Sequence, residues 1–306
     1  MTKPDHDNAK FYIDEYINIY EGKEAARRLN DHSDRAFVDP QTGITKVDAL
    51  RWQEAQRYER RTWMEHGKYT LSDRNEYHLA HFANYGPLRG ASFQRGIELG
   101  CGPFTNMRLI LDHCRVQNLH LLDPLICDYL AHPSCRYRGG KMGGLTNNSS
   151  LGQIPAAVRY PLQFVRTMLN AYRIGGFSGR PVVIEQSKIE DFQTTHQFDL
   201  VVMINVIEHC QDVNAIFNKI LQIIPQGGTF VFHDVLYDAS EVSQTLSVSY
   251  DAGHPLRVDQ ALVHRFLEDH FEPSMHAQYW IDQEFCGHKL PRQEIYYVGK
   301  RRTKAR

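Results

Sequence analysis

Residues 97–106, Ile-Glu-Leu-Gly-Cys-Gly-Pro-Phe-Thr-Asn, form a stretch in which a short apolar strand ends in an acid and turns through two glycines. Gly100 and Gly102 allow the backbone to pass close to a ligand, where any Cβ atom would collide with it. A second apolar run, residues 120–122, ends at Asp123. An acid at the carboxyl end of a parallel strand can bind ribose hydroxyls. The two segments together predict a site for an adenosine-containing cofactor.

The segments on either side of this stretch predict the rest of the sheet. Short apolar runs alternate with amphipathic segments from residue 96 onward, which is typical of βα units around a parallel sheet. The predicted strands are 95–99, 118–122, 182–186, 198–204 and 229–233, with candidate antiparallel edge strands near 278–281 and 294–299. The predicted helices are about 105–113, 213–224 and 258–270, the second with Asp212 as its N-cap.

The first 90 residues differ in character from the rest of the chain. Aromatic residues recur there at helical spacing, residues 51–66 predict a helix, and residues 37–45 carry a turn signature. We expect a helical N-terminal cap over residues 1–90 and a cofactor-binding domain over residues 91–306. Within that domain, about fifty residues at 131–180 separate the second and third strands, and we interpret them as an inserted lid.

Composition excludes several classes of protein. The chain has 306 residues, 42% of them hydrophobic, and a formal net charge of −1, so a disordered chain is excluded and broad binding to nucleic acid or an anionic membrane is disfavoured. No apolar run approaches the ~20 residues that a membrane-spanning helix needs. A polar N-terminus and six cysteines without a CxxC pair predict a cytoplasmic protein with reduced thiols and no signal peptide.

Five motifs carry a resemblance to a known family: ELGCGPFTN (98–106), LLDP (121–124), SKIEDF (187–192), FDLVVMINVIEHCQD (198–212) and IIPQGGTFVFHD (223–234). In this order they resemble the class I S-adenosylmethionine (SAM)-dependent methyltransferases, nearest to the group with N-V-x-E-H after the fourth strand. The resemblance implies an α/β fold with a Rossmann-like, mostly parallel seven-stranded sheet flanked by helices. It also implies SAM as the cofactor.

The resemblance assigns the first group of cofactor residues. Glu98 would orient the glycine loop and the amino group of the methionyl moiety. Gly100 and Gly102, with Cys101 between them, would line the carboxypropyl chain and the ribose. Asp123 would hold the ribose hydroxyls.

The second group would surround the adenine and the methyl group: Pro124, Leu125, Lys188, Ile189, Glu190, Asn205 and Val206. Ile189 would offer its backbone N–H to the adenine ring. The acid that usually stands beside it could be Glu190, because Lys188 or Ser187 occupies the more usual position. Asn205 would lie near the methyl group at the end of the fourth strand.

Three of the sixteen histidines follow strands at the expected ligand edge or lie in a nearby loop: His209, His233 and His254. An oxygen or nitrogen acceptor benefits from a base near pH 7, which histidine supplies. An alternative is that Glu208 and His209 bind a metal with one of the other two, as the similar E-x-x-E-H motif of small-RNA 2′-O-methyltransferases does. Asn205 replaces the first Glu of that motif, and we expect no metal.

The acceptor class has to come from the cap and the inserted lid. Tyr12, Tyr16, Trp63 and Arg257 are the candidate substrate-binding residues. We expect methyl transfer to an oxygen or nitrogen of a small molecule, in natural-product or sugar tailoring, by a monomer or homodimer. The alternatives are an RNA or peptide methyltransferase, or a SAM-binding regulatory protein without catalysis.

Overall fold

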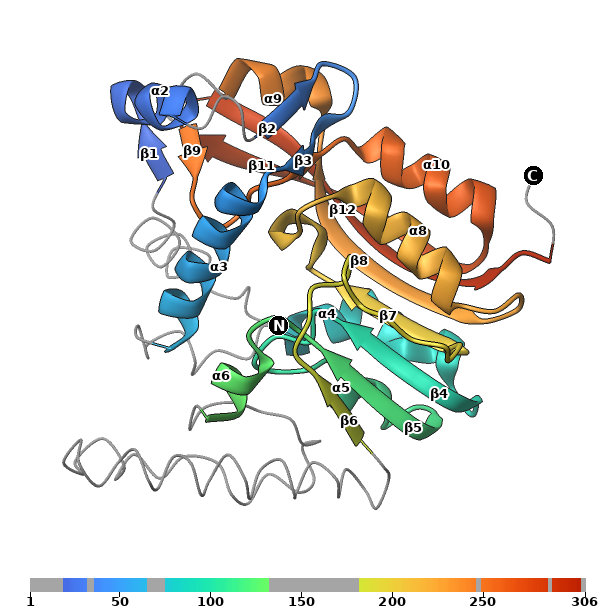
Figure 1. Ribbon diagram of the computed structural model, residues 1–306. Coiled ribbons are helices and arrows are strands. Elements are labelled where there is room, and N and C mark those ends of the chain that lie inside the picture. The colour runs from blue at the N-terminus through green and yellow to red at the C-terminus, as the bar shows by residue number, and fades with distance from the viewer. Residues whose placement is uncertain are drawn as a thin grey trace, which may run out of the picture.

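A seven-stranded sheet forms the centre of the chain in the computed structural model, which describes residues 19–31, 36–64, 75–131, 182–245, 249–285 and 288–303 (Figure 1). The strand order is β11-β12-β8-β7-β4-β5-β6. Strands β6, β5, β4, β7 and β8 are parallel, and β12 pairs antiparallel with both β8 and β11. The predicted Rossmann-like, mostly parallel fold with an antiparallel edge is therefore confirmed.

The strands of this sheet match the predicted segments and are longer at the antiparallel edge. Their bounds are β4 Ser92–Leu99, β5 Arg115–Leu122, β6 Val182–Glu185, β7 Leu200–Ile204, β8 Thr229–Tyr237, β11 Phe271–Phe285 and β12 His288–Arg301. Every residue of β7 is buried, as expected for a central parallel strand covered on both faces.

Helices cover one face of the sheet through α8 (Val213–Ile223) and α10 (Gln260–His270), which lie together in Figure 1. Phe217 and Phe266 stack between them with ring centroids 3.9 Å apart. The side chain of Asp212 accepts a hydrogen bond from Ala215 N at 3.1 Å, which confirms the predicted N-cap of α8. Asp259 caps α10 in the same way.

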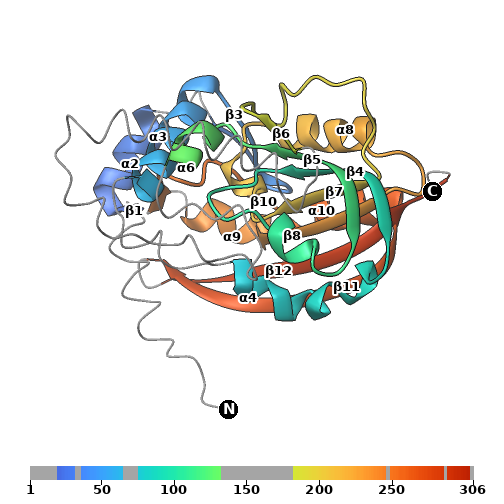
Figure 2. The same ribbon diagram turned by 90° about the horizontal axis from the view of Figure 1, so that it is seen from below.

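The other face carries α4 (Asn75–His81), the 3₁₀ turn η1 (Ala83–Leu88) and α5 (Met107–Ile110). Figure 2 shows α4 beside the β11–β12 hairpin. The helix predicted at 105–113 is reduced to the four residues of α5, because residues 111–113 form a turn that joins His113 O to Gly90 N. A short α6 (Ile126–Ala131) follows β5.

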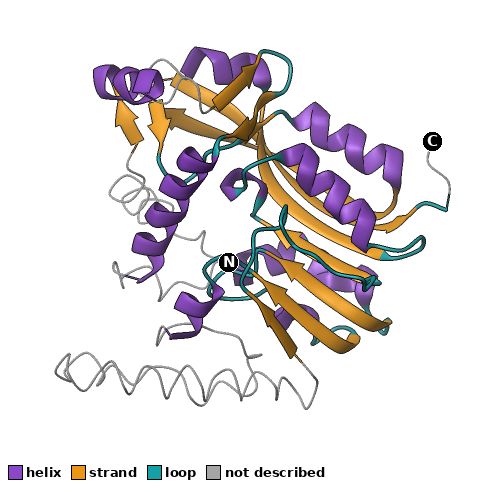
Figure 3. Cartoon of the chain, in the orientation of Figure 1, coloured by secondary structure: helices purple, strands orange, loops and turns teal. Residues whose placement is uncertain are grey.

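The N-terminal region contains short strands in addition to the helices expected of a helical cap. Its elements are β1 (Ile19–Glu21), α2 (Gly22–Asp31), β2 (Ala36–Asp39), β3 (Gly43–Val47) and α3 (Ala49–Met64). Strand β1 pairs with β9 (Ser249–Asp251), and β3 pairs with β2 and with β10 (Arg257–Val258); α9 (Ala239–Thr245) lies nearby (Figure 3). The partners of β1 and the second partner of β3 lie some two hundred residues away in the chain. Local periodicity therefore does not predict these pairings.

The inserted segment predicted as a lid lies outside the described residues from position 132 onward. Among the described helices, none is both long and apolar enough to cross a membrane. Three parts of this fold carry the candidate site described below. They are the carboxyl ends of the parallel strands, helix α3, and the loop between β9 and β10.

Candidate functional site

The glycine loop after β4 is fixed to the neighbouring strands. Gly100 and Gly102 have φ angles of 72° and 52°, in the left-handed region that favours glycine. The N–H groups of Gly100 and Cys101 both donate to Leu122 O, at 2.8 and 3.2 Å. A Cβ atom at Gly100 would lie 2.6 Å from Val206 Cγ1, so the loop passes closely beneath the segment that follows β7.

Glu98 lies beneath this loop and holds its far end. Its buried carboxylate accepts hydrogen bonds from Asn106 N at 2.7 Å, from Asn106 Nδ2 at 3.0 Å and from Met107 N at 3.3 Å, and also from the Thr105 hydroxyl. Burial raises the pKa of Glu98 to about 7, against these donors, which favour the anion. The contacts agree with the predicted orienting role toward the loop; the contact with a methionyl amino group remains a prediction.

Asp123 ends β5 and connects two loops. Its Oδ2 accepts from Gly102 N at 3.0 Å, and its Oδ1 accepts from Leu125 N at 2.8 Å. Burial raises the pKa of Asp123 to about 6; the nearby charge of His209 lowers it and that of Glu59 raises it. The charges of His209 and Glu59 therefore act on the Asp123 carboxyl.

The segment after β6 packs against the turn after β7. Glu190 Oε1 accepts from Gln211 N at 2.8 Å and from Asp212 N at 3.1 Å. Lys188 Nζ donates to Gln211 Oε1 at 2.8 Å and lies 5.2 Å from the ring centroid of Trp52. Ile189 is buried and Pro124 is half-buried. Their positions beside an adenine remain predictions.

The turn after β7 presents Asn205 at the ligand edge. Asn205 is exposed, has a φ of 58°, and donates its N–H to His233 O at 2.8 Å. Asn tolerates this left-handed conformation better than most residues. Buried Asp234 holds the next residues, because its Oδ2 accepts from Val206 N at 3.0 Å and from Ile207 N at 2.7 Å. Asp234 is a supporting residue that the sequence reasoning missed.

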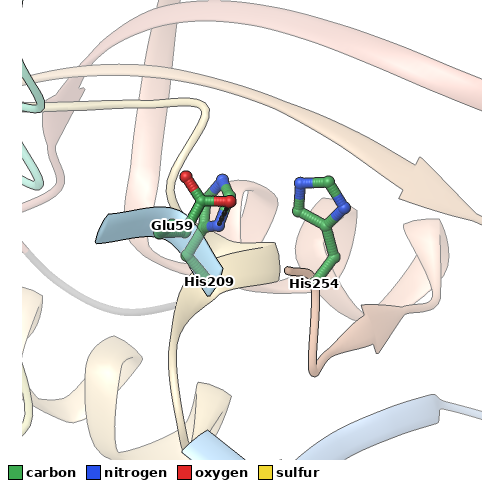
Figure 4. Close-up of side chains that lie close together, drawn as sticks. All are labelled: Glu59, His209 and His254. Atoms are coloured by element: carbon green, nitrogen blue, oxygen red, sulfur yellow. Dashed lines mark ion pairs between the residues drawn. The ribbon is translucent and has the colours of Figure 1, made fainter. Parts of the chain in front are cut away.

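Glu59, His209 and His254 come together from three separate elements (Figure 4). Glu59 lies on α3, His209 on the 3₁₀ turn η4 (Ile207–His209), and His254 between β9 and β10. One ligand atom of each residue lies within 4.8 Å of the others. His209 Nδ1 is 3.8 Å from Glu59 Oε1, and the two imidazole centroids are 4.7 Å apart. We call these three residues the Glu-His-His cluster.

Acidic side chains surround His254. Its Nδ1 lies 2.7 Å from Asp251 Oδ2, and its Nε2 lies 3.5 Å from Glu208 Oε1. Burial alone would lower the pKa of His254, but Asp251 and Glu208 outweigh it and raise the pKa to about 10. Arg292 Nη2 donates to the other oxygen of Glu208 at 3.0 Å.

His233 does not join this group. It is fully buried in β8, with its ring centroid 4.3 Å from those of His78 and Tyr296. Neither ring nitrogen has a hydrogen-bond partner among the described residues. Burial lowers the pKa of His233 well below its usual value, so the neutral ring is part of an aromatic stack on the α4 side of the sheet.

The candidate substrate residues are placed separately. Tyr12 and Tyr16 lie outside the described residues. Trp63 donates from Nε1 to Glu59 Oε2 at 3.0 Å and meets Phe104 edge-on at 5.8 Å, so it joins the cluster to the glycine loop. Arg257 is buried in β10, where its charge lowers the pKa of Asp251.

Sequence reasoning also missed Glu59, which completes the cluster. Its position within the predicted helix 51–66 and one turn before Trp63 is visible in the sequence. Nothing in the local sequence predicts that Glu59 lies close to His209 and His254 in space.

Comparisons with known proteins agree with the fold. The family model described as "Methyltransferase domain" matches residues 56–277, more than two thirds of the chain. Among curated proteins, none matches this chain.

Many solved structures resemble the chain at low sequence identity. The N-methyltransferase NodS from Bradyrhizobium japonicum WM9, in complex with S-adenosyl-L-homocysteine (SAH), is 14% identical with a TM-score of 0.45, over 83% of this chain and 99% of its own. A putative methyltransferase from Bacillus halodurans is 12% identical with a TM-score of 0.47, over 74% and 99%. The 1,6-didemethyltoxoflavin-N1-methyltransferase from Burkholderia thailandensis is 12% identical with a TM-score of 0.42, over 88% and 99%.

Proposed function

The chain belongs to the methyltransferase-domain family, the class I SAM-dependent methyltransferases that its motifs resemble, and from this premise we propose that it methylates an oxygen or nitrogen atom of a small molecule. SAM would bind between the glycine loop, Asp123 and the segment after β7. The acceptor would lie against the Glu-His-His cluster. The setting that we propose is natural-product or sugar tailoring.

The observation that supports this proposal is the position of the cluster relative to Asp123. Helix α3, which carries Glu59, is joined to the segment after Asp123 by an ion pair in which Arg60 Nε lies 3.1 Å from Asp128 Oδ2. Trp63 contacts both Glu59 and Phe104 of the glycine loop, which gives a second link between the two sides. A polar group next to the methyl donor is what an enzyme needs and a cofactor-binding regulator does not.

Displacement at a sulfonium methyl requires mainly that donor, methyl and acceptor be aligned. The acceptor must also lose a proton, and His209 is the predicted histidine best placed to help. Its Nδ1 has no hydrogen-bond partner among the described residues. Both ring nitrogens of His254 face carboxylates, and His233 is buried away from the cluster.

Transfer of an isotope-labelled methyl group tests the proposal. The protein is incubated with methyl-labelled SAM and a panel of sugars, phenols and amines, and SAH release and labelled product are measured by mass spectrometry. We expect at least one acceptor to gain the label, a large loss of rate for His209→Ala, and an unchanged rate for His196→Gln, whose exposed side chain lies before β7. Bound SAM without transfer to any acceptor, and with no SAH released, would favour the regulatory protein.

A further inference from the structure

We propose that the Glu-His-His cluster binds one divalent transition-metal ion, which would contact the acceptor atom. The proposal deepens the proposed function, and rests on it only for the contact with the acceptor. In this site His209 would be a ligand of the ion. It would then promote loss of the acceptor's proton through the bound ion and not by taking the proton itself.

The donor atoms of the cluster suit such an ion. Two imidazoles and one carboxylate offer two nitrogen ligands and one oxygen ligand within 4.8 Å of one another. Imidazole favours ions such as Zn²⁺, whereas Mg²⁺ and Ca²⁺ prefer oxygen ligands alone. Three protein ligands leave a coordination position open, which is the arrangement of catalytic rather than structural zinc sites.

His209 supplies an independent indication. Its Nδ1 is buried and has no hydrogen-bond partner among the described residues, although buried polar atoms nearly always have one. This nitrogen lies 3.8 Å from Glu59 Oε1. Two bonds of about 2 Å each can span that separation. A metal ion between the two atoms would satisfy both.

The side chains around the cluster hold the ligands as a metal site requires. A metal-binding histidine usually donates its other ring N–H to a carboxylate or carbonyl. His254 does so through Nδ1 to Asp251 Oδ2 at 2.7 Å, and its Nε2, 3.5 Å from Glu208 Oε1, is the nitrogen that would bind the ion. Trp63 Nε1 fixes the second oxygen of Glu59 at 3.0 Å.

Negative charge around the cluster attracts a cation. Glu59, Glu208 and Asp251 face the two imidazoles, and Arg292 Nη2 donates to Glu208 Oε2 at 3.0 Å. A divalent ion bound at the cluster would meet these carboxylates at close range.

Helix α3 is held close enough to contribute Glu59 because residue 253 is a glycine. A Cβ atom at Gly253 would lie 2.9 Å from Glu59 Oε1 and 2.9 Å from Tyr58 Cδ1. Gln56 Nε2 also donates to His209 O at 3.2 Å. The same helix therefore contacts both histidine-bearing segments.

The test is a metal titration of the full chain after dialysis against chelator. Zn²⁺, Mn²⁺ and Mg²⁺ are titrated separately in a calorimeter, and Co²⁺ binding is followed by visible absorption. We expect one Zn²⁺ or Mn²⁺ per chain, the tighter of the two naming the preferred ion, and no saturable binding of Mg²⁺. Glu59→Gln, which nearly preserves side-chain volume, and His209→Asn, which removes the imidazole, are expected to weaken binding at least about tenfold and to remove the Co²⁺ absorption bands.

The matched control is His196→Gln, which should bind metal as the unchanged protein does, and thermal unfolding checks that every variant is folded. The proposal is overturned if no ion binds, if Mg²⁺ binds as tightly as Zn²⁺, or if both folded cluster variants bind normally. SAH titrations separate this outcome from the proposed function: SAH binding without metal binding overturns the metal site alone, and metal binding without SAH binding overturns the cofactor assignment alone.

Discussion

Asp123 holds two loops of the proposed cofactor site together. Its two oxygens accept from Gly102 N and Leu125 N, so it sets the distance between the glycine loop and the loop after β5. Each carboxylate oxygen has further acceptor capacity for ribose hydroxyls. Since burial raises the pKa of Asp123 to about 6, its charge state changes just below neutral pH.

We predict that SAH affinity falls as the pH falls through 6. The carboxylate is the form that accepts from ribose hydroxyls and from Gly102 N, and protonation removes it below the pKa of about 6. The loss should approach about tenfold per pH unit at lower pH. Calorimetric titrations between pH 5 and pH 7.5 measure it, with Asp123→Asn as the variant that loses the part of this dependence due to Asp123. Glu98, whose pKa is about 7, titrates in the same range in both proteins. An affinity that stays constant across this range in the unchanged protein would contradict the assignment.

A second residue-scale prediction concerns Gly100. An alanine there would need φ near 72° and would place its Cβ 2.6 Å from Val206 Cγ1. We expect Gly100→Ala to lower the free energy of unfolding by about 2–4 kcal/mol and to weaken SAH binding. Gly227→Ala is the control, because Gly227 has a φ of 77° with open space around its Cβ position. Urea unfolding measures both variants. An equal loss in the free energy of unfolding would show that the contact with Val206 adds nothing to the destabilisation caused by Gly100→Ala.

At the scale of elements, α3 is the helix that completes the site. Arg51 is buried on α3 and donates from Nη1 to Ala252 O at 3.0 Å and from Nη2 to Asp251 O. These bonds join the first turn of the helix to the loop that carries His254. The position of Glu59 therefore depends on the packing of the whole helix and on the bonds that Arg51 makes.

Removing this link should destabilise the chain and displace the cluster. We predict that Arg51→Ala lowers the free energy of unfolding by about 2–3 kcal/mol, because two buried carbonyls lose a charged donor. Arg57→Ala, an exposed position on the same helix, should change it by less than about 0.5 kcal/mol. Urea unfolding of the two variants makes the comparison, and similar midpoints would argue against α3 being held in this way.

Elements with a strong local signal were predictable, and those completed by distant partners were not. The glycine loop, the acid after β5 and the Asp212 cap each depend on neighbours close in sequence, and the structure agrees with all three. Strand β1 pairs with β9, and β3 pairs with β10 as well as with its neighbour β2, so local periodicity alone does not indicate these short strands. Glu59 was missed because its partners His209 and His254 are distant in sequence. His233 was misplaced because β8 continues to Tyr237, so residue 233 lies inside the strand, against His78 of α4, and not just past the strand's end.

At the scale of the whole molecule, the sheet order brings the carboxyl ends of β4, β5 and β7 to one edge. This is where ligands bind in open α/β sheets. The N-terminal region crosses that edge through α3, whose last turns lie beside α6 and η4 (Figures 1 and 2). A formal net charge of −1 accompanies this arrangement, without the excess of basic residues that a polyanion would need.

Charge balance leads to a prediction about partners. If the acceptor is a small molecule, a fluorescently labelled single-stranded or duplex RNA should show no saturable binding at physiological salt, because affinity for nucleic acid depends on neutralising phosphates with Lys and Arg. Fluorescence anisotropy in the presence of SAH measures this. Binding that weakens steeply with added salt would favour an RNA methyltransferase instead.

Calorimetric titration of SAH into the unchanged protein and into Asp123→Ala tests the central claim that this chain binds SAM between the glycine loop and Asp123. We predict one SAH per chain, a loss of roughly tenfold to hundredfold for Asp123→Ala, and unchanged affinity for Asp112→Ala, an exposed acid in the turn after α5. Equal affinity of the Asp123→Ala variant and the unchanged protein, with both folded, would contradict the account.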